Sequence, residues 1–229
     1  MAPRSVGESV TERLALFPLG TVLFPGLVLP LHLFEERYRT LIADLLERPE
    51  PRGFGVVGIE LGHEVGDGAA HRLAEVGCVA ELREATPHPD GRYDVVAVGT
   101  RRFRLKELDR SRPYLQGEVE YLPEEPGADP GPMALRVRRL FRLYRHRLAA
   151  AGAASTEQGE PPDDPVGLSY VIAASLILDG HDKQRLLECD DAALRLEAER
   201  DLLMRENGIL DVLPVIPAGQ FLDGSFTPN

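Results

Sequence analysis

Apolar residues dominate the chain from Leu14 to Phe34, a stretch of twenty-one residues without a charged side chain. A helix of about 20 apolar residues is long enough to cross a bilayer. Prolines at Pro18, Pro25 and Pro30 interrupt this stretch, and each interior proline removes a helix hydrogen bond at a cost of roughly 3 kcal/mol. The pattern therefore predicts short buried strands joined by Pro/Gly turns rather than a membrane helix.

Three extended pieces are expected in this region, at Leu14–Phe17, Thr21–Phe24 and Leu27–Leu33. Charged residues follow directly after Phe34, and in this region apolar residues recur at helical spacing. The residues of that stripe are Phe34, Tyr38, Leu41, Ile42, Leu45 and Leu46. The sequence thus predicts buried strands followed by one amphipathic helix.

Strand patterns continue up to about residue 122, because short runs alternate apolar and polar residues or are continuously apolar. The expected strands are Phe54–Glu60, Cys78–Thr86, Tyr93–Val98, Phe103–Leu108 and Leu115–Leu122. Asp90-Gly91 lies between two of them and is a strong hairpin-turn pair. Residues 10–122 are therefore predicted to form a small curled sheet or open barrel with one early helix.

The spacing of apolar residues becomes helical beyond a loop rich in proline and glycine at Pro123–Pro132. Asp164-Pro165 is an N-cap followed by proline at the first helical position, and Gly208 is expected to end the last helix. We predict a helical bundle over residues 131–208 and an apolar, proline-interrupted tail over residues 209–229. The fold class is α+β.

The chain is acidic, with a net charge of −11 and a pI near 5.1. This charge disfavours nonspecific binding to nucleic acid or anionic membranes. The first residues are polar and contain no apolar signal-peptide segment, so we expect a cytoplasmic protein. Cys78 and Cys189 are far apart in sequence, and we interpret both as buried thiols.

Several residue pairs have spacings that invite a search for metal sites or catalytic groups. His32 and Glu35 have H-x-x-E spacing, but His32 lies in an apolar strand-to-helix transition and is interpreted as a structural histidine. His63, Glu64 and His71 do not have the spacing that puts two imidazoles on one helical face. No pair of acidic residues is marked as a general acid and base. We therefore expect no metal, no cofactor and no catalytic residue.

Two basic clusters, Arg101–Arg112 and Arg136–Arg147, stand out against the acidic background. The simpler interpretation is a solvated face on which arginine stems cover apolar surface. The alternative is a patch for an anion, RNA or an acidic partner. Its candidate residues are Arg101, Arg102, Arg104, Arg138, Arg142 and Arg145.

An ordered series of motifs gives the chain a family resemblance. It runs from LFPLGTVLFPGLVLPLHLFEERY through GVVGIE, a PDGRY turn and GTRRFR to KQRLLE. These motifs resemble the amino-terminal, substrate-binding domain of bacterial Lon proteases over about residues 13–206. The resemblance implies a PUA-like pseudo-barrel for the β-rich part.

Lon proteases carry an ATPase module and a Ser–Lys protease module after this domain. An ATPase would need a G-x-x-x-x-G-K-[ST] phosphate loop, and the sequence contains no Gly-Lys pair. The resemblance therefore implies a stand-alone, non-enzymatic recognition module without either catalytic module.

The leading hypothesis is that this module binds unfolded client polypeptides through apolar surface or by adding a strand to a sheet edge. Candidate contact residues are Phe24, Pro25, Phe34 and Tyr38, provided that the side chains are solvent-accessible. A separate protease is a further candidate partner, and the tail from Ile209 is a candidate for exchange between subunits. We expect no membrane partner, and nucleic-acid binding remains the alternative function.

Overall fold

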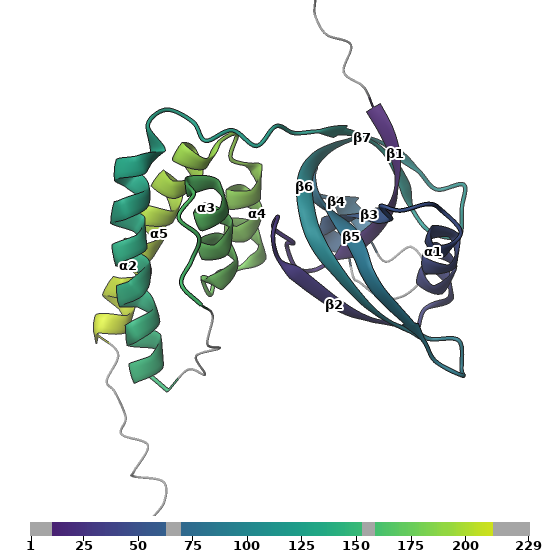
Figure 1. Cartoon of the computed structure of the whole chain (residues 1–229), viewed down its shortest axis with the longest axis horizontal. Coiled ribbons are helices and arrows are strands. Elements are labelled where there is room, and N and C mark those ends of the chain that lie inside the picture. Colours follow the sequence, from purple (N-terminus) through teal and green to yellow (C-terminus); the bar gives the residue numbers. More distant parts are fainter. Residues whose placement is uncertain (1–10, 63–69, 153–158, 213–229) are drawn as a thin grey trace, which may run out of the picture. The chain divides into compact units, whose positions relative to one another are not determined.

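The computed structural model describes residues 11–62, 70–152 and 159–212. The contacts divide these residues into two compact units (Figure 1). The β-rich unit contains the described residues up to Glu125 together with Ala173–Asp190. The helical unit contains the described residues of Pro126–Ile172 and those from Asp191 onward.

The β-rich unit is built on one sheet that closes on itself. Its strands are β1 (Thr11–Leu19), β2 (Val28–Leu33), β3 (Gly53–Gly62), β4 (Ala70–Leu73), β5 (Val76–Pro87), β6 (Tyr93–Asp109) and β7 (Gln116–Tyr121). They pair in the order β1-β7-β6-β5-β3-β4, and a parallel pairing of β1 with β3 completes a ring of β1, β7, β6, β5 and β3. Strand β2 lies outside this path and pairs with β6.

Strand β6 organises the sheet because it is long enough to have three partners. It pairs with β5 over Tyr93–Arg104, with β2 over Tyr93–Val98, and with β7 from Phe103 onward. The sequence pattern predicts two strands here, but the structure has one continuous strand. The predicted hairpin is confirmed, since Gly91 has a φ of +80° between β5 and β6.

The predicted strand at Thr21–Phe24 is not formed. The segment folds back onto β6 instead, where the Gly26 amide donates to the Gly99 carbonyl and the Gly99 amide donates to the Leu27 carbonyl, both at 2.8 Å. These bonds satisfy backbone groups without a ladder, so the segment can bury Phe24 while it leads into β2.

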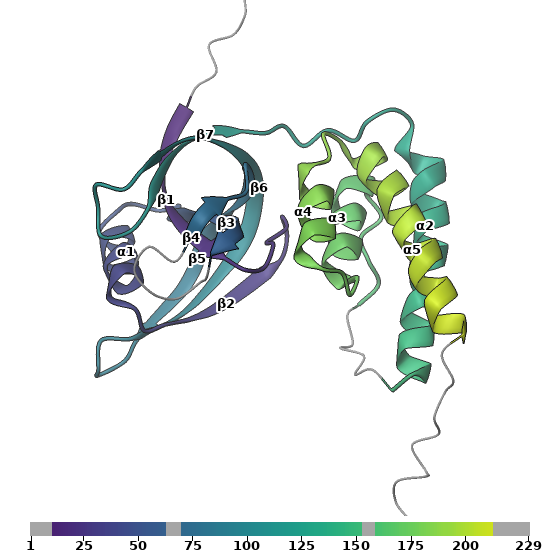
Figure 2. The same cartoon turned by 180° about the vertical axis from the view of Figure 1, so that it is seen from behind.

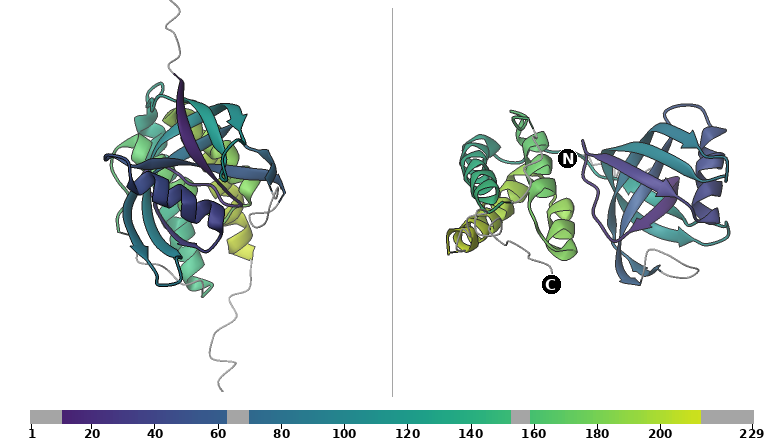
Figure 3. Two further views of the ribbon diagram at one scale, coloured as in Figure 1. Left: turned by 90° about the vertical axis from the view of Figure 1, so that its right-hand side faces the viewer. Right: turned by 90° about the horizontal axis from the view of Figure 1, so that it is seen from below.

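Helix α1 (Glu36–Leu46) packs its predicted apolar stripe into the main core. Tyr38, Leu41, Ile42 and Leu45 are all at most 5% exposed. The Tyr38 ring lies 4.1 Å from the Phe17 ring, centroid to centroid. Figure 3 shows α1 in front of the strands of this unit. The helix thereby fixes the position of the segment that joins it to β2.

Helix α4 (Gly180–Glu188) belongs to the β-rich unit, whereas the sequence places it in a helical subdomain over residues 131–208. The Gln184 side chain donates to the Val76 carbonyl of β5 at 2.9 Å. Arg102 of β6 donates to the carbonyls of Leu187, Cys189 and Asp190. Polar side chains thus join α4 to the sheet, and helical periodicity does not reveal them.

The helical unit is built around α2 (Pro130–Ala150) and α5 (Ala192–Val212), which lie side by side (Figure 2). Helix α3 (Pro165–Ser175) begins in this unit. Its predicted cap is confirmed, because the Asp164 carboxylate accepts from the amides of Val166 and Gly167.

The predicted end of the last helix at Gly208 is wrong. Helix α5 continues to Val212, since a glycine lowers helix propensity by only about 1 kcal/mol and does not by itself end a helix. Residues 209–212 of the predicted tail are therefore helical, and the rest of that tail lies outside the described residues.

The described residues form a mixed α/β fold with a β-rich part and five helices, as the predicted fold class requires. Across the parts of the chain that the structure describes, we find no helix with the length and apolarity needed to span a bilayer. The long uncharged stretch at the start of the chain is instead divided between β1, the folded-back segment and β2.

Candidate functional site

A small apolar cavity opens on the β-rich unit beside β2, and we call it the β1–β2 slot. Its volume is about 160 Å³. The lining residues are Phe17, Pro18, Leu19, Leu31, His32, Leu33, Phe34, Glu35 and Tyr38. They come from the end of β1, the end of β2 and the start of α1, so one continuous stretch of sequence supplies all three walls.

Strand pairing explains why a slot exists at this place. The end of β1 pairs with β3 over Leu16–Leu19, while β2 pairs with β6 over Val28–Leu33. Among the described strands, β2 has no second partner. The slot therefore lies beside an open strand edge.

The open edge of β2 is interrupted by a proline. The Gly99 amide donates to the Leu27 carbonyl and Val28 lies opposite Val98, so the backbone groups of Leu29, Leu31 and Leu33 face β6. Those of Val28, Pro30 and His32 face the open edge. Pro30 has no N–H to offer there, which is a common way to protect an edge from uncontrolled strand pairing.

The slot has a buried floor and an exposed aromatic residue at its entrance. Tyr38 is 5% exposed and packs on Phe17, and the guanidinium of Arg37 lies 4.5 Å from its ring centroid. Arg37 also forms an ion pair with Glu35 at 2.9 Å. Phe34 is 53% exposed at the entrance, which is unusual for a large aromatic side chain.

The four candidate polypeptide-binding residues fall into two pairs, of which only one lines the slot. Phe24 is fully buried and Pro25 is buried, so neither meets the condition of solvent access; both belong to the segment folded onto β6. Phe34 and Tyr38 line the slot, one at its entrance and the other in its floor.

The sequence did not single out every residue of β2 that matters at the slot. Leu31 and Leu33 line the slot, whereas Val28, 63% exposed, lies on the opposite face of β2. The clue in the sequence is the run VLPLHLF, which is more apolar than a strand with one solvated face requires. Pairing with β6 on one edge decides which of these side chains remain outside.

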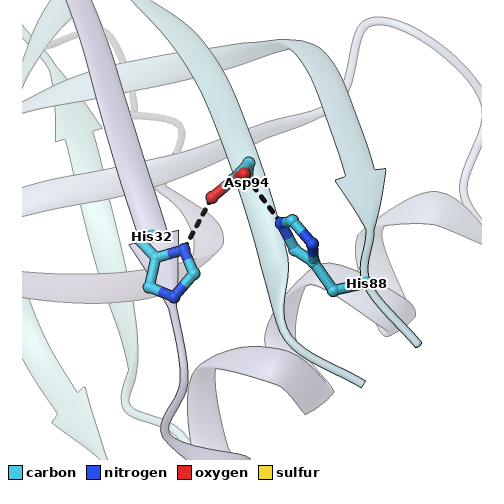
Figure 4. Close-up of side chains that lie close together, drawn as sticks. All are labelled: His32, His88 and Asp94. Carbon is cyan, nitrogen blue, oxygen red and sulfur yellow. Dashed lines mark hydrogen bonds and ion pairs between the residues drawn. The ribbon is translucent and has the colours of Figure 1, made fainter. Parts of the chain in front are cut away.

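A polar cluster adjoins the slot through His32 (Figure 4). His32 Nδ1 lies 2.6 Å from Asp94 Oδ1, and His88 Nε2 lies 2.7 Å from Asp94 Oδ2. The hydrogen bonds from His32 and His88 lower the pKa of the Asp94 carboxyl below its ordinary value. His32 therefore has a polar partner in Asp94.

The first basic cluster does not form one patch. Arg102 is 1% exposed, and its guanidinium is occupied by Glu124 and four backbone carbonyls, so the prediction that it faces an anion is wrong. Arg101 is exposed and stacks 3.5 Å from the Tyr121 ring centroid, beside a separate cavity of about 350 Å³. Arg104 is half-buried.

The second cluster is engaged within the helical unit. Arg138 donates to the carbonyls of Pro161 and Pro162. Arg142 forms an ion pair with Glu160 at 3.0 Å, and Arg145 lies over the Phe141 ring at 5.9 Å from its centroid. Arg138 and Arg142 therefore hold the segment before α3 against α2, and these intramolecular partners compete with any external anion. Arg145 instead contacts a ring of its own helix.

A sequence profile of the family described as the ATP-dependent protease La (LON) substrate-binding domain matches residues 13–205. Similar curated proteins include Lon protease 2 of Myxococcus xanthus, which is 30% identical over 207 residues. Lon protease 2 of Syntrophobacter fumaroxidans is 29% identical over 193 residues. These matches cover 89% and 83% of this chain but only 25% and 24% of the two relatives, so the chain spans about a quarter of their length.

Two solved structures are similar over most of the chain. The Lon N-terminal domain protein from Xanthomonas campestris has a TM-score of 0.57 at 25% identity, covering 89% of this chain and 99% of that one. The N-terminal domain of Mycobacterium avium complex Lon protease has a TM-score of 0.61 at 19% identity, covering 88% and 100%. Because the second structure is only 19% identical, its similarity supports the fold alone.

Proposed function

The chain belongs to the family of LON substrate-binding domains, and we propose that it recognises polypeptides by seating an apolar side chain in the β1–β2 slot. The observation that carries this proposal is the exposed Phe34 at the entrance of an apolar cavity. Unfolded protein segments expose apolar side chains that folded proteins bury, so such a cavity discriminates between the two.

The size of the slot fits one large side chain. Its volume of about 160 Å³ is similar to that of an apolar cavity of about 150 Å³ that binds benzene. A leucine or phenylalanine side chain of a client would therefore fill it. Burying such a side chain contributes about 1.5–3 kcal/mol, which corresponds to weak binding that suits transient capture of many sequences.

The strand edge beside the slot favours a short contact over a long added strand. Val28 and His32 offer backbone groups at this edge, but Pro30 between them offers only a carbonyl. A bound segment would therefore gain few main-chain hydrogen bonds. We infer that side-chain burial supplies most of the affinity and that selectivity is for an apolar anchor residue.

The names of the relatives suggest the context of this activity. They are Lon proteases, and a domain of this family would deliver captured polypeptides to proteolysis. We propose client polypeptides and a protease as the partners and no catalytic step for the described residues. The arginine-based alternative, an RNA or anion patch, gains no support from side chains that are already paired.

The test is binding of fluorescein-labelled, permanently unfolded peptides, measured by fluorescence anisotropy. One peptide carries a single phenylalanine in a polar sequence and its partner carries serine at that position. Phe34→Ser should weaken binding of the phenylalanine peptide about tenfold, about 1.4 kcal/mol, and leave the serine peptide unchanged.

Leu135→Ser is the matched control, because Leu135 is a similarly exposed apolar residue on α2, 62% exposed. This variant should bind both peptides like the unchanged protein. Equal loss of binding in Phe34→Ser and Leu135→Ser would contradict a defined slot. Tight RNA binding that weakens steeply with added salt would support the alternative instead.

A further inference from the structure

We propose that His32, His88 and Asp94 form a binding site for a divalent transition-metal ion of the Zn²⁺ class at the rim of the β1–β2 slot. The ligand atoms are His32 Nδ1, His88 Nε2 and a carboxylate oxygen of Asp94. All three lie within 4.8 Å of one another. Two imidazoles and one carboxylate are a donor set that Zn²⁺ and its neighbours in the first transition row prefer.

The backbone holds the three residues together. His32 of β2 lies directly opposite Asp94 of β6 in the antiparallel register, at a position without ladder hydrogen bonds, where facing side chains come closest. His88 lies in the turn that joins β5 to β6. The bonds from the His88 amide to the Arg92 carbonyl and from the Gly91 amide to the His88 carbonyl fix this turn.

The side chains can adjust to an ion without disturbing the core. Zn²⁺ takes its nitrogen and oxygen ligands at about 2.0–2.2 Å, so tetrahedral ligand atoms lie about 3.3–3.5 Å apart. The carboxylate oxygens would have to move outward from 2.6 and 2.7 Å, and the two imidazoles inward. The side chains of His32, His88 and Asp94 are 49%, 37% and 54% exposed, so small rotations suffice.

One nearby cation opposes the ion. The Arg92 guanidinium lies 3.5 Å from His32 Nε2, although Asp90 holds it in an ion pair. Repulsion between this arginine and a dication predicts that removal of the Arg92 charge strengthens metal binding. A surface that merely collected cations through its net acidity would respond equally to the loss of any arginine.

Three protein ligands leave the remaining positions of the ion to water, as in open zinc sites. Because His32 also lines the slot, the ion would lie next to the proposed position of a bound polypeptide. The metal site does not require that polypeptide binding be correct. Its test uses the metal alone.

The experiment is calorimetric titration of the whole chain with ZnCl₂, together with the visible absorption of added Co²⁺. We expect one ion per chain in this site. His32→Gln, His88→Gln and Asp94→Asn should each lose it, whereas Arg92→Gln should bind more tightly. His181→Gln is the control, since His181 is exposed on α4 outside the cluster.

Nitrogen-15 spectra of the histidine side chains identify the metallated atoms. Zn²⁺ should shift His32 Nδ1 and His88 Nε2 and leave His146 and His181 unchanged. The proposal is wrong if the zinc stoichiometry is the same in His32→Gln, His88→Gln and the unchanged protein. Absence of any binding at millimolar zinc would also refute it. Thermal unfolding of each variant checks that the substitution has left the fold intact.

Discussion

The guanidinium of Arg102 in β6 donates to the carbonyl of Leu187 at the end of α4, with a nitrogen–oxygen distance of 2.8 Å. The same side chain donates to the carbonyls of Cys189, Asp190 and Pro123 and to the Glu124 carboxylate. All five donors of the guanidinium are thereby used. A charge that is 1% exposed persists in the fold because these acceptors replace water completely.

Replacing Arg102 should therefore destabilise the β-rich unit severely. Arg102→Met leaves four carbonyls without this donor and should lower the free energy of unfolding by about 3 kcal/mol or more. Urea denaturation measures this loss. Arg101→Met is the control at the exposed neighbour and should cost less than about 1 kcal/mol. A similar loss in both variants would contradict the specific role of Arg102.

The loss of stability in Arg102→Met should be concentrated on α4. In Arg102→Met, hydrogen exchange of the α4 amides should become faster than in the unchanged protein, because the helix loses its main polar connection to β6. The amides of α2, in the helical unit, should be unaffected. Equal acceleration in both helices would show that the variant unfolds globally rather than releasing α4.

Glu199 on α5 should make the helical unit more stable in mild acid than at alkaline pH. It is fully buried, and neither carboxylate oxygen has a hydrogen-bond partner among the described residues. Burial raises its pKa well above 4.5, partly opposed by the charge of Arg195. Since the folded state holds this proton more tightly than the unfolded state, stability falls as pH rises from about 4.5 toward the raised pKa.

Glu199→Gln removes this titration. The variant should lose the fall in unfolding free energy between pH 5 and pH 8 and be more stable than the unchanged protein at pH 8. Denaturant titrations at both pH values measure the effect. Glu197→Gln, at an exposed position of the same helix, should keep the original pH dependence; an identical dependence in all three proteins would contradict the assignment.

Cys78 and Cys189 should differ in reactivity. Cys78 is 1% exposed, and burial raises its pKa to about 12, so almost no thiolate is present at pH 8. Cys189 is partly exposed. With an aromatic disulfide reagent at pH 8, the native protein should release one equivalent quickly and the second only in denaturant. Two equally fast equivalents would contradict the buried thiol, and Cys189→Ser should abolish the fast phase.

Pro30 should protect the open edge of β2. Pro30→Val supplies an N–H that points away from β6, and we expect increased self-association, measured by light scattering against concentration. The change should cost the monomer no more than about 1 kcal/mol, because the proline nitrogen takes no part in pairing with β6. Pro113→Val, in an exposed loop, is the control. Unchanged scattering in Pro30→Val would show that the edge is covered by other means.

Local pattern in the sequence is sufficient for much of the fold. Three prolines exclude a membrane helix at the start of the chain, and the spacing of Tyr38, Leu41, Ile42 and Leu45 predicts α1 and its buried face. Asp90-Gly91 predicts the hairpin, and Asp164-Pro165 predicts the start of α3. These features depend on residues within one or two turns of each other, so they are visible without the rest of the molecule.

The positions of the functional side chains depended on contacts between distant residues. Pairing of β2 with β6 buries one part of an apolar run and leaves Phe34 and Val28 exposed. The same pairing brings His32 to Asp94, sixty-two positions away. Likewise, Arg102 finds its acceptors after α4, more than eighty positions away. The amino-acid sequence by itself determined most of the strands, turns and helices, because those choices follow largely from local sterics and periodicity. Only the tertiary structure decided which side chains share a surface, because strand register and burial arise when the whole chain packs.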